Sequence, residues 1–123
     1  MHHERLHVDS RMVNGVPLLH PRGEIDLYTV SEFERAMSNA LDVVVKAVIV
    51  DLSDISYLDS SGLSALIVAY KKLAAQGGEL YVVAPREPPA VRRVLEITRV
   101  DTFVRVRPTL DDVARELSMS HAA

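Results

Sequence analysis

Two nearly continuous aliphatic segments, residues 47–52 (AVIVDL) and 79–84 (ELYVVA), constrain the fold of this chain more than any other feature. Short apolar runs of this kind are typical of strands that are buried on both faces of a sheet. Between them, the spacing of apolar residues predicts a helix from about residue 60 to residue 75, which Gly77-Gly78 ends. Because strand, helix and strand alternate, we expect parallel strands joined by helical crossovers.

The N-terminal part of the chain predicts a β-hairpin. Residues 6–13 and 16–20 are strand-like, and the Asn14-Gly15 pair between them is a strong signal for a two-residue turn. Proline has no backbone N–H to donate, so Pro17 indicates that the ladder begins after it. The hairpin would add one antiparallel strand to the sheet.

Three further helices and one further strand complete the expected fold. Thr29 and Glu32 match a capping box at the start of the first helix, whose apolar stripe is Phe33, Met37, Ala40 and Leu41. Pro88-Pro89 introduces a short helix, and residues 103–106 form the last strand. Thr109 caps a final helix that faces inward with Leu110, Val113, Ala114 and Leu117. The expected fold is an α/β domain with a mostly parallel sheet of four to five strands, an N-terminal antiparallel hairpin strand and about four helices.

Length and charge limit the function classes. The 123 residues suffice for one domain, which we place at residues 6–117 with flexible tails at 1–5 and 118–123. A hydrophobic fraction of 48% is that of an ordinary globular protein. The formal net charge of −3 argues against a nucleic-acid partner, because phosphate binding needs a basic patch.

Several site types lack their sequence signals. The chain has no cysteine, which excludes disulfides and thiolate metal sites. No set of histidines and acids has metal-ligand spacing, and we expect no metal and no cofactor. No apolar run approaches the ~18 residues of a membrane span, and residues 1–7 lack the apolar stretch of a secretory signal. We therefore expect a cytoplasmic protein with no membrane partner.

The segment 58–66 (LDSSGLSAL) carries the candidate site. Asp59 and, earlier in the chain, Asp26 each follow a strand, and functional residues of parallel sheets gather beyond the carboxyl ends of the strands. If those two strands are neighbours, the two acids lie together beside Ser60 and Ser61. Gly62 in the first turn of the helix costs up to ~1 kcal/mol relative to alanine, which indicates that another group approaches the backbone closely.

A helical projection assigns the faces of the helix that follows. At about 100° per residue, Ser61 lies opposite a broad apolar stripe. The stripe, which we expect to face the core, comprises Leu63, Leu66, Ile67, Tyr70, Leu73 and Ala74. Ser64, Ala65, Val68 and Lys72 share the face of Ser61 and predict a flat docking surface. Val68 is its apolar contact, although partial burial of Val68 by a neighbouring helix is an equally ordinary explanation.

Two interpretations of the serines remain open at this point. Asp59 or Ser60 could serve only as the N-cap of the helix. Alternatively, Ser61 could accept a phosphate of about −1.5 to −2 charges, which the positive end of a helix tolerates well. A partner pressed against the same surface would then meet a new, desolvated charge and dissociate.

A resemblance to a known family favours the second interpretation. Residues 54–84 (DISYLDSSGLSALIVAYKKLAAQGGELYVVA) resemble the core of the STAS domain of bacterial anti-sigma factor antagonists, and residues 23–30 (GEIDLYTV) resemble the family's Gly-Glu-Leu-Asp segment. The resemblance extends over residues 6–117. It implies phosphorylation of Ser61 by an anti-sigma factor that has an ATP-dependent serine kinase fold, loss of binding, and dephosphorylation by a PP2C-type phosphatase.

The resemblance also implies a partner-binding surface and no catalytic activity. The expected surface residues are Asp26, Asp59, Ser60, Ser61, Ser64, Ala65 and Val68. We expect a monomer or a weak dimer. The chain departs from the family after the third helix, where Thr98-Arg99-Val100 replaces a Ser/Thr-Gly-Leu turn, and this change affects a helix C-cap and bears on partner specificity.

Three alternatives have weaker support in the sequence. A serine hydrolase would need a base, for which His20 is the one candidate, but the G-x-S-x-G elbow is absent. A response-regulator receiver domain would explain residues 48–53 (VIVDLS), but Asn14-Gly15 and Arg107-Pro108 stand where that family needs an acidic pair and a lysine. A STAS-fold subunit for ligand binding or transport is the third alternative.

Overall fold

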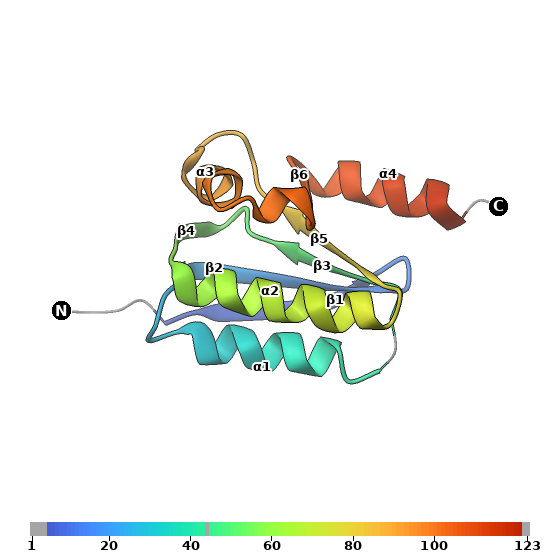
Figure 1. Ribbon diagram of the computed structural model, residues 1–123, viewed down its shortest axis with the longest axis horizontal. Helices are drawn as coiled ribbons and strands as arrows, with labels where there is room; N and C mark the ends of the chain where they lie inside the picture. Colours follow the sequence, from blue (N-terminus) through green and yellow to red (C-terminus); the bar gives the residue numbers. More distant parts are fainter. Residues whose placement is uncertain (1–4, 44, 122–123) are drawn as a thin grey trace.

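Figure 1 shows the computed structural model, which describes residues 5–43 and 45–121. The strands are β1 (His7–Val13), β2 (Val16–Ile25), β3 (Ala47–Asp51), β4 (Ile55–Leu58), β5 (Glu79–Val83) and β6 (Arg105–Arg107). The helices are α1 (Val30–Ala40), α2 (Ser60–Ala75), α3 (Ala90–Ile97) and α4 (Leu110–His121), with a 3₁₀ turn, η1, at Val100–Thr102. Residues 1–4 and 122–123 of the expected tails lie outside the described residues.

The strands form one mixed sheet in the order β1-β2-β3-β5-β6, and β4 pairs with β2 beside this path. β1 and β2 are antiparallel and every other pairing is parallel, which confirms the α/β class and the hairpin. The 6-stranded sheet has more strands than we expected, because β4 was not among the predicted strands. β4 is short, and its middle residues are exposed, so it lacks the apolar run of a central strand.

β2 makes two different pairings along its length. Leu18 and Leu19 pair with β3, whereas the segment from Gly23 to Ile25 pairs with β4. The register shifts between Gly23 and Glu24, and Gly23 has a positive φ of 122° that favours glycine. β2 therefore changes partner near its carboxyl end, where the candidate site lies.

The ladder of the hairpin begins at Val16, two residues earlier than predicted. Val13 pairs with Val16 across a turn in which Asn14 and Gly15 both have positive φ. Pro17 pairs with Met12 and is part of the ladder, so the expectation that pairing starts after it was wrong. In an antiparallel ladder, hydrogen-bonded and non-hydrogen-bonded pairs of residues alternate. Pro17 and Met12 form a non-hydrogen-bonded pair, so the nitrogen of Pro17 points away from β1 and the ladder needs no N–H from it.

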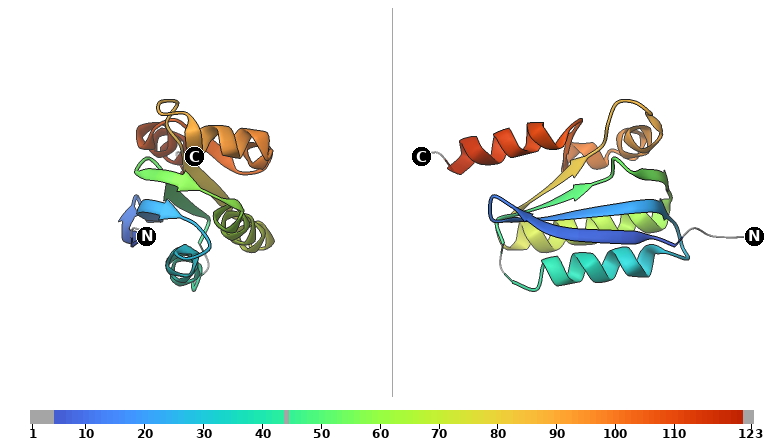
Figure 2. Two further views of the ribbon diagram at one scale, coloured as in Figure 1. Left: turned by 90° about the vertical axis from the view of Figure 1, so that its left-hand side faces the viewer. Right: turned by 180° about the vertical axis from the view of Figure 1, so that it is seen from behind.

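Helices cover both faces of the sheet (Figure 2). One face packs against α1, α2 and α3 through residues such as Phe33, Leu66 and Leu95. The other face packs against α4 through Val113 and Leu117. The candidate site belongs to the first face, at the amino-terminal end of α2.

The ends of the C-terminal helices and strands agree with the sequence except at the start of β6, and a second disagreement occurs at the start of α1. α2 ends in a Schellman motif, with Gly77 N–H bonded to the Ala74 carbonyl and Gly78 N–H to that of Leu73. The Thr109 hydroxyl accepts the N–H of Asp112 and caps α4 as predicted. The last strand starts at Arg105 instead of residue 103, because η1 and a left-handed Arg99 (φ 61°) occupy the preceding segment. The start of α1 lies in the candidate site and is described there.

Candidate functional site

Asp26 and Asp59 follow the ends of two adjacent parallel strands. Ile25 of β2 pairs with Leu58 of β4, and the N–H of Asp59 donates to the carbonyl of Ile25 at 3.2 Å. The strand before Asp59 is β4 and not the segment 47–52 named in the sequence analysis. The geometry nevertheless brings the two acids to one edge of the sheet, beside the start of α2.

Asp59 is the N-cap of α2. One carboxylate oxygen, Oδ1, accepts the backbone N–H of Ser61 at 2.9 Å and that of Gly62 at 3.4 Å. Two of the amides that a helix leaves unpaired at its start are thereby satisfied. Of the two cap candidates in the sequence, Asp59 has this role and Ser60 is the first residue of the helix.

The serine hydroxyls are not used by the fold. Ser60 is exposed and Ser61 is half-buried. Within residues 5–43 and 45–121, no protein group hydrogen-bonds either hydroxyl, although the backbone of Ser61 is fixed by Asp59. Ser61 thus combines a fixed backbone with an uncommitted hydroxyl.

Gly62 explains how closely the helix approaches the sheet. A Cβ at this position would lie 2.3 Å from Cδ1 of Leu58 and 2.8 Å from Cγ2 of Ile25. Both neighbours are buried, so they have little room to move. The close approach anticipated from the sequence is therefore made by the chain's own strand ends, and it fixes the serines relative to both acids.

The loop after β2 is held by its own side chains. Oδ1 of Asp26 accepts the N–H groups of Tyr28 (2.8 Å) and Thr29 (3.0 Å). The Thr29 hydroxyl donates to the Glu24 carbonyl and accepts the N–H of Asp26. Thr29 is at the N-cap position of α1 but makes no side-chain cap bond, so the predicted capping box with Glu32 was wrong. Its hydroxyl stabilises the loop that carries Asp26 instead.

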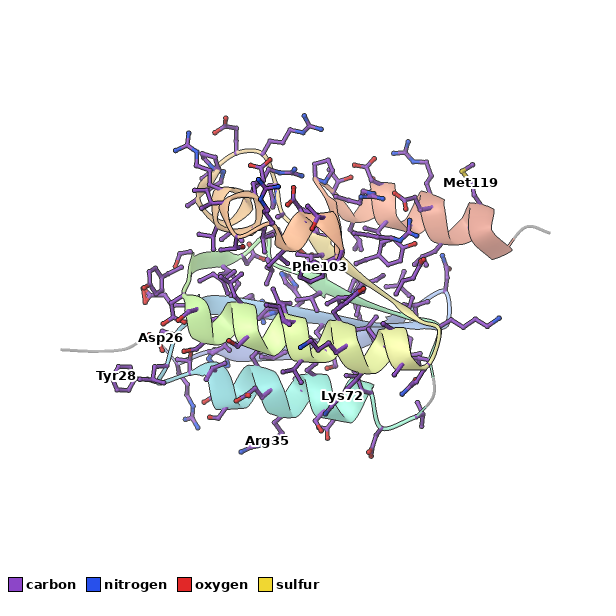
Figure 3. The ribbon with its side chains drawn as sticks, viewed as in Figure 1. Asp26, Tyr28, Arg35, Lys72, Phe103 and Met119 are labelled. Atoms are coloured by element: carbon purple, nitrogen blue, oxygen red, sulfur yellow. The ribbon has the colours of Figure 1, made fainter. Side chains whose placement is uncertain are left out.

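Three large exposed residues beside the motif were missed by the sequence analysis. Leu27 and Tyr28 are 72% and 71% exposed, and Tyr57 on β4 is 50% exposed. Figure 3 shows Tyr28 extending away from the body of the molecule next to Asp26. The available signal was two large residues in a loop directly after an acid, where small polar residues are the rule.

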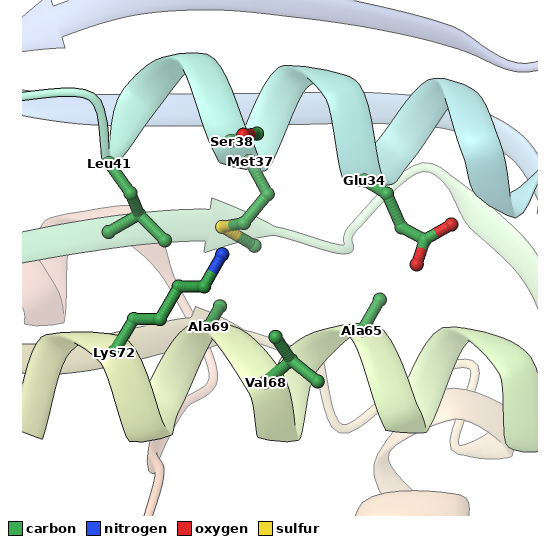
Figure 4. Close-up of a pocket in the computed structure, with 8 residues that line it drawn as sticks. All are labelled: Glu34, Met37, Ser38, Leu41, Ala65, Val68, Ala69 and Lys72. Carbon is green, nitrogen blue, oxygen red and sulfur yellow. The ribbon is translucent and has the colours of Figure 1, made fainter.

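A groove lies between α1 and α2 (Figure 4), and the α2 residues that line it, among them Val68 and Lys72, share the helix face of Ser61. Its volume is about 210 Å³, and it is lined by Glu34, Met37, Ser38, Leu41, Ala65, Val68, Ala69 and Lys72. Val68 is 51% exposed and contributes both to this groove and to the open surface. Ala65, which the sequence analysis placed on the docking surface, is buried beneath α1.

The core face of α2 is rotated relative to the projection. The buried residues are Gly62, Ala65, Leu66, Ala69 and Leu73, whereas Ala74 is exposed and not part of the core. Leu63, Ile67 and Tyr70 are half-buried at the margin. The small residues at 65 and 69 allow α1 to pack closely, and this contact draws the buried face toward them.

His20 does not lie beside Ser61. Its Nε2 is 2.6 Å from Oδ2 of Asp54, and its neighbour Leu18 two residues earlier belongs to the α4 face of the sheet. His20 therefore points to the face opposite α2. The arrangement supports no serine–histidine pair. In the described part of the chain, no group of three histidines or acids could hold a metal ion.

Shifted pKa values occur at the other edge of the sheet. Burial, followed by the charge of Glu79, raises the pKa of Tyr81 on β5. The hydrogen bond that Arg107 on β6 donates to the carboxylate of Glu116 raises the pKa of Arg107. These groups stabilise the packing of α4 and lie away from the serine motif.

The STAS domain family model matches residues 7–113. The chain belongs to the STAS domain family. It is 33% identical to an anti-sigma factor antagonist from Mycobacterium paratuberculosis of known crystal structure, with a TM-score of 0.82 and coverage of 91% of this chain and 92% of the other. The anti-sigma-B factor antagonist of Staphylococcus aureus is 31% identical over 84 residues, which are 68% of this chain and 76% of the relative. By homology this STAS domain belongs with the anti-sigma factor antagonists.

The fold is also that of the anti-sigma factor antagonist SpoIIAA. The unphosphorylated form of SpoIIAA superimposes with a TM-score of 0.76 at 21% identity, covering 91% of this chain and 96% of the other. In the described residues, no helix of this STAS domain is long and apolar enough to cross a membrane.

Proposed function

We propose that this STAS domain binds an anti-sigma factor with an ATP-dependent serine kinase fold, releases a sigma factor, and is switched off by phosphorylation of Ser61. The observation that carries the proposal is the uncommitted Ser61 hydroxyl on a backbone that Asp59 holds in place. A kinase can modify this hydroxyl without breaking a contact of the fold. The protein acts by binding and release and performs no catalysis itself.

Electrostatics supports a switch in association. The first amides of α2 already bond to Asp59, so a phosphate on Ser61 cannot replace that cap. The phosphate would remain at the surface and add about −1.5 to −2 charges next to the carboxylates of Asp59 and Asp26. A partner that covers this surface would have to desolvate the combined charge, at a cost of several kcal/mol.

The proposed docking surface surrounds Ser61. It retains Asp26, Asp59, Ser60, Ser61, Ser64 and Val68 from the sequence, and gains Leu27, Tyr28 and Tyr57. Ala65 contributes only as the floor of the groove beside Val68. Exposed aromatic and aliphatic side chains around a polar centre are typical of interfaces whose contact energy is concentrated in few residues.

The accessibility of Ser61 also allows dephosphorylation. A PP2C-type phosphatase must reach the phosphate on Ser61, and the half-buried position at a helix start leaves one side open. Because sigma factors act on cytoplasmic RNA polymerase, this role places the STAS domain in the cytoplasm.

The proposal is tested by affinity capture from lysate of the source organism. The baits are the wild type, Ser61→Ala, Ser61→Glu and, as a matched charge control, Ser118→Glu on the exposed side of α4. We expect mass spectrometry to identify an anti-sigma factor with every bait except Ser61→Glu. Equal capture of that anti-sigma factor by all four baits would exclude the charge switch. Incubation of the captured partner with ATP should then phosphorylate the wild type and not Ser61→Ala.

A further inference from the structure

β1 is an open edge of the sheet. Within the described residues it pairs only with β2, and its outer side meets no other strand. Viewed from behind in Figure 2, β1 crosses the molecule with no helix in front of it. The strand contains no proline, so nothing in its backbone prevents a further strand from pairing with it.

The ladder with β2 determines which backbone groups of β1 face outward. Val13 and Val16 flank a two-residue turn and form a hydrogen-bonded pair, so the bonded positions alternate from there. The residues bonded to β2 are Val13, Arg11, Asp9 and His7. The N–H and C=O groups of Val8, Ser10 and Met12 therefore point to the open edge. Pro17 and Pro21 lie opposite Met12 and Val8, in agreement with this alternation.

We propose that two copies of this chain associate through β1, antiparallel, with Ser10 opposite Ser10 of the second copy. This register pairs the outward groups of Val8, Ser10 and Met12 of both copies in a continuous ladder. It also places Asp9 opposite Arg11 of the second copy, twice by symmetry. These are non-hydrogen-bonded positions, where opposing side chains approach most closely.

Charge selects this register over its neighbours. If the second strand slides along β1 so that the centre of symmetry moves from Ser10 to Asp9, Asp9 lies opposite Asp9 of the second copy. If the centre moves to Arg11 instead, Arg11 lies opposite Arg11 of the second copy. Like charges directly opposite one another are destabilising, whereas opposite charges stabilise the pairing. The sequence of β1 is thus self-complementary around Ser10, which is what an isologous strand interface requires.

The face of β1 toward α1 offers apolar surface to the second copy. Met12 is 62% exposed and borders a groove of about 350 Å³ between the hairpin and the end of α1. The groove is also lined by Pro17, Ala40 and Val43. In the proposed register Met12 lies opposite Val8 of the second copy, on the same side as this groove.

The strand interface is distinct from the proposed docking surface. The groove beside β1 and the groove beside α2 lie on opposite sides of α1. A dimer formed through β1 leaves Ser61 of both copies accessible. The proposed dimer and the proposed phosphorylation switch can therefore be tested independently of each other.

Two single charge reversals test the interface. We expect the wild type to form a concentration-dependent dimer in sedimentation velocity. Arg11→Asp and Asp9→Arg should each raise the dissociation constant roughly tenfold or more, because both symmetric contacts become like-charged. An equimolar mixture of the two variants should form a heterodimer with wild-type affinity, since each contact then again joins an aspartate to an arginine.

Two further variants keep the test independent of folding. The double variant Asp9→Arg/Arg11→Asp should dimerise as the wild type does, although like Asp9→Arg it lacks the exposed ion pair between Asp9 and Arg22. Ser10→Pro removes an outward N–H without disturbing the ladder to β2 and should be monomeric with an unchanged thermal midpoint. A wild type that stays monomeric at millimolar concentration overturns the proposal. So does a variant mixture no tighter than its components, or a Ser10→Pro variant that still dimerises.

Discussion

At the scale of single residues, consecutive side chains at the start of α2 have different roles. Asp59 caps the helix, and Gly62 allows the helix to pack closely against the ends of β2 and β4. Ser61, which lies between them in the sequence, has a hydroxyl that makes no hydrogen bond to the residues that the structure describes. The sequence motif predicted Ser61 as the phosphate acceptor but left open whether Asp59 or Ser60 caps the helix. Only the geometry of the carboxylate decides this, because Asp59 and Ser60 are both good N-cap residues.

Asp59→Ala should lower the free energy of unfolding by about 1 kcal/mol, because two helix amides lose their acceptor. Asp59→Asn keeps a capping oxygen and should change stability by only a few tenths of a kcal/mol. Urea denaturation followed by circular dichroism measures both. If Ser60→Ala were as destabilising as Asp59→Ala, Ser60 would share the capping role.

Gly62→Ala should destabilise the domain by about 1–3 kcal/mol, although alanine is the better helix former. The added methyl group would collide with Leu58 and Ile25, both of which are buried. Ser64→Ala, on the exposed side of the same helix, is the matched control and should be nearly neutral. The cost of Gly62→Ala should shrink in a Leu58→Ala background, which removes the nearer obstacle, and full additivity in this double-mutant cycle would contradict the collision.

At the scale of elements, long patterns were predictable and short ones were not. The runs 47–52 and 79–84 and the helix between them were identified from apolar spacing alone. β4 was not predicted, because it has only four residues and its two central ones are exposed, so its sequence shows no alternation of apolar and polar residues. The rotation of α2 was missed because a projection weights side chains by hydrophobicity, whereas Ala65 and Ala69 are buried by the close approach of α1.

The turn after α3 is strained by a residue that the sequence flagged as a departure from the family. Arg99 has a φ of 61°, a conformation that costs an L-residue about 1–2 kcal/mol. Arg99→Gly should therefore raise the free energy of unfolding by about 0.5–1 kcal/mol, after the greater freedom of glycine in the unfolded chain is subtracted. Arg99→Ala should leave stability unchanged. A stabilisation by alanine equal to that by glycine would show that the side chain, and not the backbone angle, is responsible.

At the scale of the whole molecule, the fold separates two surfaces. The parallel strands β2 and β4 end beside the start of α2 and form the candidate site, whereas the antiparallel strand β1 lies at the sheet edge beyond α1. The sequence predicted that β1 exists but not that its outer side is open, since strand order follows from long-range pairing that no local pattern encodes. One groove beside α1 therefore adjoins the docking surface around Ser61, and the other adjoins the open edge of β1.

This separation has a measurable consequence if both proposals hold. The wild type should bind its anti-sigma factor as a complex of two antagonists with two partners, whereas Arg11→Asp should bind one to one. The affinity per site should be the same within about twofold, because surfaces without shared residues contribute almost additively. Light scattering gives the stoichiometry, and calorimetry gives the affinity. A large loss of affinity in Arg11→Asp would place β1 inside the partner interface, and Ser61→Glu should abolish binding in both backgrounds while leaving the dimer intact.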